Sequence, residues 1–213
     1  MQQKLKPEVF WMSLIGCLFA WAGIGIQLYD MLQAQQLSVF NSLIKFFSYF
    51  TILTNLLVAV YFSSIVFATS SVCSGFFRKY SSTTAITVYI LVVGIIYNIS
   101  LRQIWVFTGW AKLANELLHT VTPLYFLCYW FFITKKEKLS FRVIIYWMLY
   151  PLFYLVYTLI RGTIVHNYPY PFVDVNSLGY PGVILNCLIV AALFFILFAI
   201  FIAISNRLKP HNE

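Results

Sequence analysis

Charged side chains are scarce in this chain of 213 residues: Asp, Glu, Lys and Arg together make up 9% of it, and only six are acidic. A soluble globular domain usually has about 25% charged residues, which keep its surface polar. Hydrophobic residues make up 62% of the chain, and its mean hydropathy is +0.84. This composition excludes a water-soluble domain and indicates an integral membrane protein.

Cysteine is also rare, with four residues and no Cys-X-X-Cys pair. Three of the four lie within apolar segments, where a thiol usually acts as a small packing group. The sequence therefore predicts neither a disulfide framework nor a cysteine metal site, and we expect no cofactor. The four residues are Cys17, Cys73, Cys128 and Cys187.

Long apolar segments recur six times along the chain, with polar breaks between them. A helix needs roughly 20 such residues to cross a hydrocarbon layer of about 30 Å, whereas barrel strands are about ten residues long and alternate in polarity. We therefore predict an all-α polytopic membrane protein, a single six-helix transmembrane bundle over residues 1–213. The predicted spans are Val9–Tyr29, Phe46–Ala68, Thr84–Trp105, Glu116–Ile133, Val143–Ile160 and Val183–Ile204.

Basic residues are unevenly divided between the two sides that six spans create. Because cytoplasmic loops carry an excess of Lys and Arg, the richer side predicts that both termini are cytoplasmic. The formal charge of +8 is then a topology signal, and no nucleic-acid partner is expected. The first apolar segment is too long for a signal peptide and is expected to remain as a span. The poorer side holds Lys45, Arg102, Lys112 and Arg161, and the richer side holds Lys4, Lys6, Arg78, Lys79, Lys135, Lys136, Lys138, Arg142, Arg207 and Lys209.

A polar stripe interrupts the second predicted span, in the segment FSYFTILTNLL (47–57). At 100° per residue, Ser48, Thr51, Thr54 and Asn55 fall within one arc of about 120°. Serine and threonine in membrane helices often only bond nearby carbonyls or neighbouring helices. A packing role and a functional role therefore both stay open for this stripe.

His119 is the only histidine within a predicted span, near the outer end of the fourth. An ionisable group at membrane depth is costly unless it faces the bundle interior or a watery cavity. Thr51 is expected at a similar depth, so the two side chains can meet. His119 is therefore the first functional candidate, with a structural hydrogen-bonding role as the alternative.

Other polar residues gather at the same outer end. Asn98 and Arg102 lie one turn apart at the end of the third span, and the longest outer loop, HNYPYPFVDVNSLGYPG, holds His166 and Asp174. The prolines of this loop predict an ordered cap with fixed turns and not another helix. The sequence thus predicts a group of polar side chains in the outer half of the membrane, and the rule that places Lys and Arg on the cytoplasmic side does not account for them.

Three motifs in this order resemble a known family: YFTILTNLL in the second span, NELLHTVTPLYF in the fourth and YPYPFVDV after the fifth. The chain resembles the androgen-induced gene and androgen-dependent tissue-factor-pathway-inhibitor-regulating proteins, in their small bacterial branch, often labelled the Pr-six-Pr membrane proteins. The resemblance covers nearly all of the chain. It implies a six-helix hydrolase of the bacterial inner membrane that uses an intramembrane threonine nucleophile and a histidine. Animal members hydrolyse fatty acid esters of hydroxy fatty acids.

Carried over by motif, the resemblance implies that Thr51 is the nucleophile and His119 the base, with Thr54 open as an alternative nucleophile. The chemistry is independently reasonable, because a threonine hydroxyl is a weak nucleophile that needs a neighbouring base. An imidazole can take its proton and return it to the departing alcohol. The expected substrate is a lipid ester that reaches the site from the bilayer.

Four further residues are candidates to assist this pair. Glu116 lies one turn before His119, and Asp174 can descend from the loop, so either is a candidate to orient the imidazole. Asn55 and Arg102 place donors in the same outer half, where they are candidates to stabilise an oxyanion or hold a fatty carboxylate. The residues leave the choice among them open.

Other classes of function compete with hydrolysis. Arg102, Arg161 and His119 also suit a transporter or receptor that binds an anionic or amphiphilic ligand in an outer cavity, although no internal repeat is visible. Glu116 and His119 have the i, i+3 spacing of helical carboxylate metal sites, but one such pair supplies too few ligands. An assembly or signalling protein without chemistry is the third alternative.

Overall fold

The computed structural model describes residues 6–34, 38–67 and 72–208. It is 84% helical, and no strand occurs in the described residues, in agreement with the predicted all-α class. The chain divides into two compact units, Met1–Lys135 and Lys136–Glu213. That all 213 residues form one domain stays a prediction. Lys4, Ala68 and Lys209, which figure in the predicted spans and topology, lie outside the described residues.

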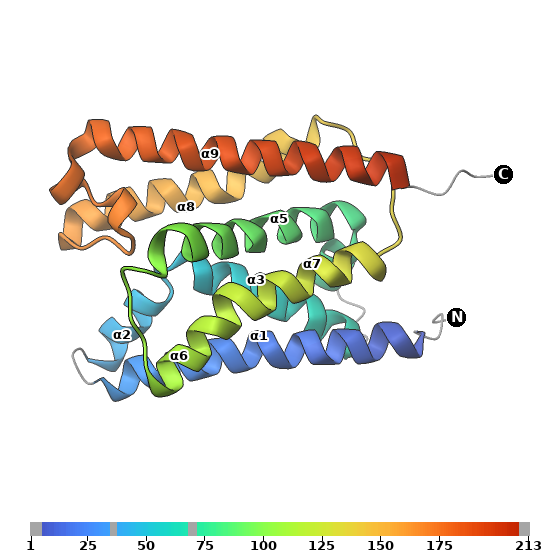
Figure 1. Cartoon of the computed structure of the whole chain (residues 1–213), viewed down its shortest axis with the longest axis horizontal. Coiled ribbons are helices and arrows are strands. Elements are labelled where there is room, and N and C mark those ends of the chain that lie inside the picture. The colour runs from blue at the N-terminus through green and yellow to red at the C-terminus, as the bar shows by residue number, and fades with distance from the viewer. Residues whose placement is uncertain (1–5, 35–37, 68–71, 209–213) are drawn as a thin grey trace. The chain divides into compact units, whose positions relative to one another are not determined.

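The first unit is built around α3, which packs against α1 on one side and α5 on another (Figure 1). α6 packs on α1, and α7 packs on α5. Its core is aromatic: Phe62, Phe126, Tyr129 and Trp130 are almost completely buried. The elements are α1 (Pro7–Gln33), α2 (Val39–Phe46), α3 (Phe50–Val66), α4 (Val72–Arg78), α5 (Tyr80–Ile96), the π-helical η1 (Tyr97–Leu101), α6 (Gly109–Glu116), the π-helical η2 (Leu117–Val121) and α7 (Thr122–Phe132).

The close packing of α1 against α3 depends on a small residue. Gly16 of α1 lies against the ring of Phe62 from α3, and a Cβ atom at this position would overlap that ring. In membrane helices, packing replaces the hydrophobic effect as the main source of association, so small residues that let helices approach are favoured. Gly16 therefore sets the distance between these two helices.

The second unit consists of two long helices, α8 (Val143–Val165) and α9 (Val175–Leu208), with a short 3-10 turn, η3 (Pro171–Val173), between them. α8 and η3 both pack on α9. His166 ends α8 in a left-handed conformation with φ of 50°. The loop after α8 is shorter than predicted, because helix resumes at Val175, with a break at Gly179, whose φ of 64° is not helical.

Most of each predicted span is helical, although residues 47–49 and 102–105 are not helical and Ala68 lies outside the described residues. Fewer than six helices meet the requirements for crossing a membrane. Four are long and apolar enough, Pro7–Gln33, Tyr80–Leu101, Val143–Val165 and Val175–Leu208, and a fifth is counted if α2 and α3 form one span despite a bend of 78°. The helical stretch 109–132 is not among them, because Glu116, His119 and their neighbours lower its hydropathy.

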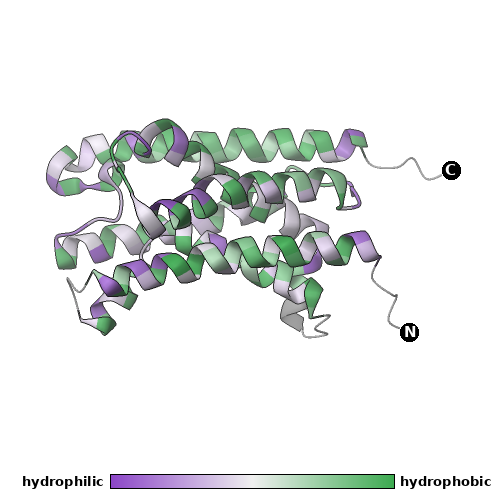
Figure 2. Ribbon diagram, turned by 60° about the horizontal axis from the view of Figure 1, so that its bottom comes forward, coloured by the Kyte–Doolittle hydropathy of each residue, from purple (hydrophilic) through white to green (hydrophobic). Residues whose placement is uncertain are grey.

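Hydrophobic residues are nearly continuous along most of α9, as the colouring in Figure 2 shows. Large hydrophobic residues are exposed on both helices of the second unit, among them Ile145, Phe153, Leu188 and Phe195. Exposed apolar surface of this extent is unfavourable in water but not in lipid. The helices therefore identify a membrane protein.

Candidate active site

Thr51 and His119 meet in the first unit, although 68 residues separate them in the sequence. The Oγ1 atom of Thr51 lies 3.3 Å from Nε2 of His119. Thr51 belongs to the first turn of α3, and His119 is the central residue of η2. Thr51 is only 7% exposed, so the contact is shielded from bulk solvent. The geometry favours Thr51 over Thr54 as the partner of His119.

The other ring nitrogen of His119 defines its tautomer. Nδ1 lies 3.0 Å from the main-chain carbonyl oxygen of Asn115, and a carbonyl oxygen can only accept a hydrogen bond. Nδ1 therefore carries the proton, and in the neutral imidazole Nε2 is left as an acceptor. The hydroxyl of Thr51 can donate to Nε2, which is the arrangement that a general base requires.

A sharp bend places Thr51 at the start of a helix. The chain leaves the helix at Phe47 and re-enters it at Phe50, and the hydroxyl of Ser48 donates to the carbonyl of Ile44 at 2.6 Å. The predicted continuous stripe is therefore corrected, because Ser48 lies in the break while Thr51, Thr54 and Asn55 follow on α3. The first turn of α3 carries the positive end of its helix dipole, which favours a developing negative charge beside Thr51.

Asn55 connects the two elements that carry the pair. Its Nδ2 donates to the carbonyl of Thr51 at 2.9 Å and to that of Leu118 at 3.2 Å. A flipped amide would turn Oδ1 toward two carbonyl oxygens, which would repel it. Both amide hydrogens are thus used, and in this structure Asn55 joins α3 to η2 and does not offer a donor to an oxyanion. Its Oδ1 is buried and has no partner among the described residues.

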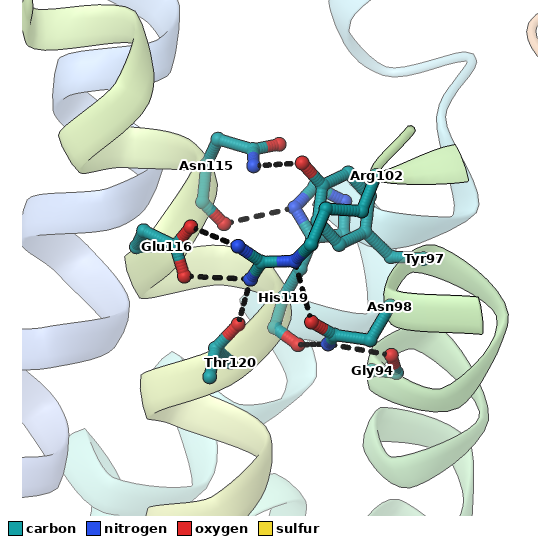
Figure 3. A network of polar contacts seen from close by, with 8 residues as sticks. All are labelled: Gly94, Tyr97, Asn98, Arg102, Asn115, Glu116, His119 and Thr120. Carbon is teal, nitrogen blue, oxygen red and sulfur yellow. Dashed lines mark hydrogen bonds and ion pairs between the residues drawn. The ribbon is translucent and has the colours of Figure 1, made fainter. Parts of the chain in front are cut away.

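Arg102 and Glu116 bind each other and not the catalytic candidates (Figure 3). Nη1 and Nη2 of Arg102 donate to the two carboxylate oxygens of Glu116 at 2.6 and 2.8 Å. Nη2 also donates to Thr120 at 2.9 Å, and Nε donates to Asn98 at 2.8 Å. In this structure the carboxylate of Glu116 binds Arg102, and the group that contacts Nδ1 of His119 is the main-chain carbonyl of Asn115.

Tyr97 and Asn115 contact the imidazole, and the sequence patterns indicated neither of them. The ring of Tyr97 stacks on that of His119, with centroids 4.1 Å apart and planes inclined by 25°. The Nδ2 of Asn115 donates to the hydroxyl of Tyr97. The spacing of Asn115 four residues before His119 could have indicated a shared helix face, but Tyr97 is one of 15 tyrosines and carries no distinguishing signal.

The remaining candidates lie in the second unit. Asp174 accepts a hydrogen bond from the main-chain N–H of Asn176 at 2.9 Å, and Arg161 donates to the carbonyl of Asn167 at 3.2 Å. Both contacts fasten the polypeptide around the end of α8 and the start of α9. Among residues 6–34, 38–67 and 72–208, no three His, Cys, Asp or Glu side chains are grouped as ligands for a metal ion.

Comparison of the chain with models of protein families, with curated proteins and with solved structures found no match. Its class therefore rests on the fold and the residues themselves. The fold and the site define a helical membrane protein with a shielded pair of threonine and histidine at the junction of α3 and η2.

Proposed function

We propose that the protein is an intramembrane hydrolase of lipid esters, with Thr51 as nucleophile and His119 as general base. One observation carries the proposal: Oγ1 of Thr51 lies 3.3 Å from Nε2 of His119, while the carbonyl of Asn115 holds the proton on Nδ1. A weak nucleophile, its base and a group that orients the base are the three parts of nucleophilic hydrolysis.

The reaction proceeds in two halves. Oγ1 of Thr51 attacks the ester carbonyl carbon as its proton passes to Nε2 of His119, and the carbonyl oxygen becomes an oxyanion beside the first turn of α3. The carbon–oxygen bond to the alcohol then breaks, and Nε2 returns the proton to the departing oxygen. Water attacks the acyl-threonine, passes a proton to Nε2, and the acid leaves as Oγ1 regains that proton.

The proposed substrate is a fatty acid ester of a hydroxy fatty acid, or a similar lipid ester, that enters from the bilayer. Resemblance of the motifs around Thr51 and His119 to the bacterial Pr-six-Pr branch supports this class. The proposal includes six spans, with the α2–α3 pair and the stretch 109–132 as two of them, in a bacterial inner membrane with cytoplasmic termini. The uneven distribution of Lys and Arg supports that orientation.

A transporter or receptor for an anionic ligand has less support. Such a protein would need an unpaired cation near His119, and the guanidinium of Arg102 is already bound by the carboxylate of Glu116. An ester is neutral at its reacting group and needs no such cation. The pairing of Arg102 with Glu116 therefore counts against capture of an anionic ligand by this guanidinium.

Labelling by a fluorophosphonate probe tests the proposal, because the probe reacts covalently with an activated hydroxyl. We expect labelling of the purified wild-type protein in detergent and loss of labelling in Thr51→Ala and His119→Ala. Thr51→Ser should retain it, because a serine offers the same nucleophilic oxygen. Thr54→Ala serves as the matched control, and unchanged thermal unfolding of each variant shows that the fold is intact.

The outcomes separate the alternatives. Unchanged labelling in both Thr51→Ala and His119→Ala would refute the proposed pair. Loss of labelling in Thr54→Ala alone would transfer the nucleophile to Thr54. Release of fatty acid from a long-chain ester by the wild-type protein, and not by Thr51→Ala, is the expected result of a turnover assay.

A further inference from the structure

Tyr97 covers one face of the His119 imidazole. The two rings are stacked with their centroids 4.1 Å apart, and Tyr97 is only 2% exposed. A stacked ring at this distance blocks any large tilt of the imidazole out of its plane, because such a tilt would drive the two rings into each other. The plane of the imidazole is therefore restricted by a residue from another helix.

Asn115 contacts both of these rings through different atoms. Its main-chain oxygen accepts from Nδ1 of His119 at 3.0 Å, and its side-chain Nδ2 donates to the hydroxyl of Tyr97. Asn115 is itself 5% exposed, so both contacts are shielded from competing water. Tyr97, Asn115 and His119 thus form a closed cycle of three contacts, which we call the imidazole clamp.

The clamp lies where two irregular helical segments meet. Tyr97 is the first residue of η1, and His119 is the central residue of η2; both segments are π-helical. Asn98, next to Tyr97, donates to the main-chain oxygen of His119 at 3.1 Å. Such segments hold well under 1% of residues in proteins, and they occur frequently at functional sites. The contact between two π-helical segments, η1 and η2, therefore supports a functional role for this part of the structure.

We propose that Tyr97 and Asn115 are positioning residues that hold the imidazole of His119 with Nδ1 protonated and Nε2 directed at Thr51. Tyr97 restrains the plane of the ring, and Asn115 fixes both the tautomer and the hydroxyl of Tyr97. The catalytic consequence of the clamp rests on the proposed hydrolase function, whereas the state of the imidazole does not. The two statements can therefore be tested separately.

Nitrogen-15 NMR of the imidazole tests the clamp itself. The chain has three histidines, so replacement of His166 and His211 by Gln leaves only the signals of His119. At a pH where the ring is neutral, we expect one tautomer with Nδ1 protonated, retained in Tyr97→Phe, because the stacked ring remains. In Tyr97→Leu we expect signals of both tautomers, since the ring can turn. Asn115→Ala keeps the main-chain oxygen that binds Nδ1 and loses only the bond to the Tyr97 hydroxyl, so it should retain one tautomer, as Tyr97→Phe does.

The rate of fluorophosphonate labelling measures the catalytic consequence. A displacement of about 1 Å can cost on the order of 100-fold in rate, so we expect a loss of tenfold or more in Tyr97→Leu and about threefold or less in Tyr97→Phe. If Tyr97→Leu does not fold, Tyr97→Met, which also removes the stacked ring, decides the question.

A wild-type tautomer in every folded variant would overturn the proposed clamp. Altered tautomers in a protein that the probe never labels would support the clamp and count against the hydrolase. A labelling rate that is unchanged despite altered tautomers would overturn the positioning role.

Discussion

Replacement of Asn55 tests how the structure connects α3 to η2. The side chain is fully buried, and its Nδ2 donates to the carbonyls of Thr51 and Leu118 at 2.9 and 3.2 Å. Asn55→Asp keeps the size of the side chain but removes both donors and directs a carboxylate at two carbonyl oxygens. Asn55→Ala removes the donors without adding charge. Comparison of the two variants separates the hydrogen bonds from the electrostatic effect.

The expected magnitudes follow from the number of bonds and from the burial. A hydrogen bond contributes about 1 kcal/mol net to stability, so Asn55→Ala should lower the free energy of unfolding by about 2 kcal/mol through its two bonds. A buried charge without a partner costs about 3 to 5 kcal/mol, so Asn55→Asp should be the more destabilised variant. Both should also slow labelling of Thr51, whose carbonyl is one of the two acceptors.

Thermal and SDS-induced unfolding in detergent micelles, followed by circular dichroism, measures these differences. Asn98→Asp is the matched control, because Asn98 also donates from Nδ2 to two carbonyls, those of Gly94 and His119. Asn98 is exposed, and its Oδ1 accepts from Nε of Arg102, which would attract a carboxylate. We expect a smaller loss in this control. An Asn55→Asp protein as stable as the wild type would refute the assigned orientation of the Asn55 amide.

Two further predictions concern packing and charge. Gly16→Ala should lower the free energy of unfolding by about 1 to 3 kcal/mol, since its Cβ would overlap the ring of Phe62. Gly25→Ala is the control and should not lower it, because no atom lies within 4 Å of the added Cβ. Equal effects of the two variants on the unfolding midpoint would contradict the close approach of α1 and α3. The side chains of Arg102 and Glu116 are 39% and 32% exposed. A double-mutant cycle should therefore give a coupling free energy between them of about 0.2 to 1 kcal/mol, and this energy should decrease as salt is added. A coupling free energy that salt does not reduce would count against an exposed ion pair.

The positions of the helices could be predicted from the sequence because apolar residues recur over membrane-spanning lengths. The limits of that reasoning appear at residues 47–49, where the chain bends by 78° between α2 and α3. The segment has neither Pro nor Gly, so no helix-breaking residue marked the break. Tertiary packing decides such a bend, and its effect is to place Thr51 in the first turn of a helix.

The meeting of Thr51 and His119 could also be expected, since polar side chains at equal depth in lipid gain by facing each other. The partner of Nδ1 could not be identified, because it is a main-chain oxygen and every residue carries one. Glu116 was the natural candidate by charge and spacing, but Arg102 from the end of η1 binds it. The sequence does not reveal which of several nearby partners a carboxylate takes.

The sequence by itself determined that this is a membrane protein, that it is helical, and that Thr51 and His119 are its first functional candidates. These depend on composition and on local spacing, which are properties of the chain before it folds. Only the tertiary structure decided the distance between Oγ1 of Thr51 and Nε2 of His119 and the presence of Tyr97 over the face of the imidazole. Those features depend on contacts between α3, η1 and η2, which are distant in the sequence and come together when the helices pack.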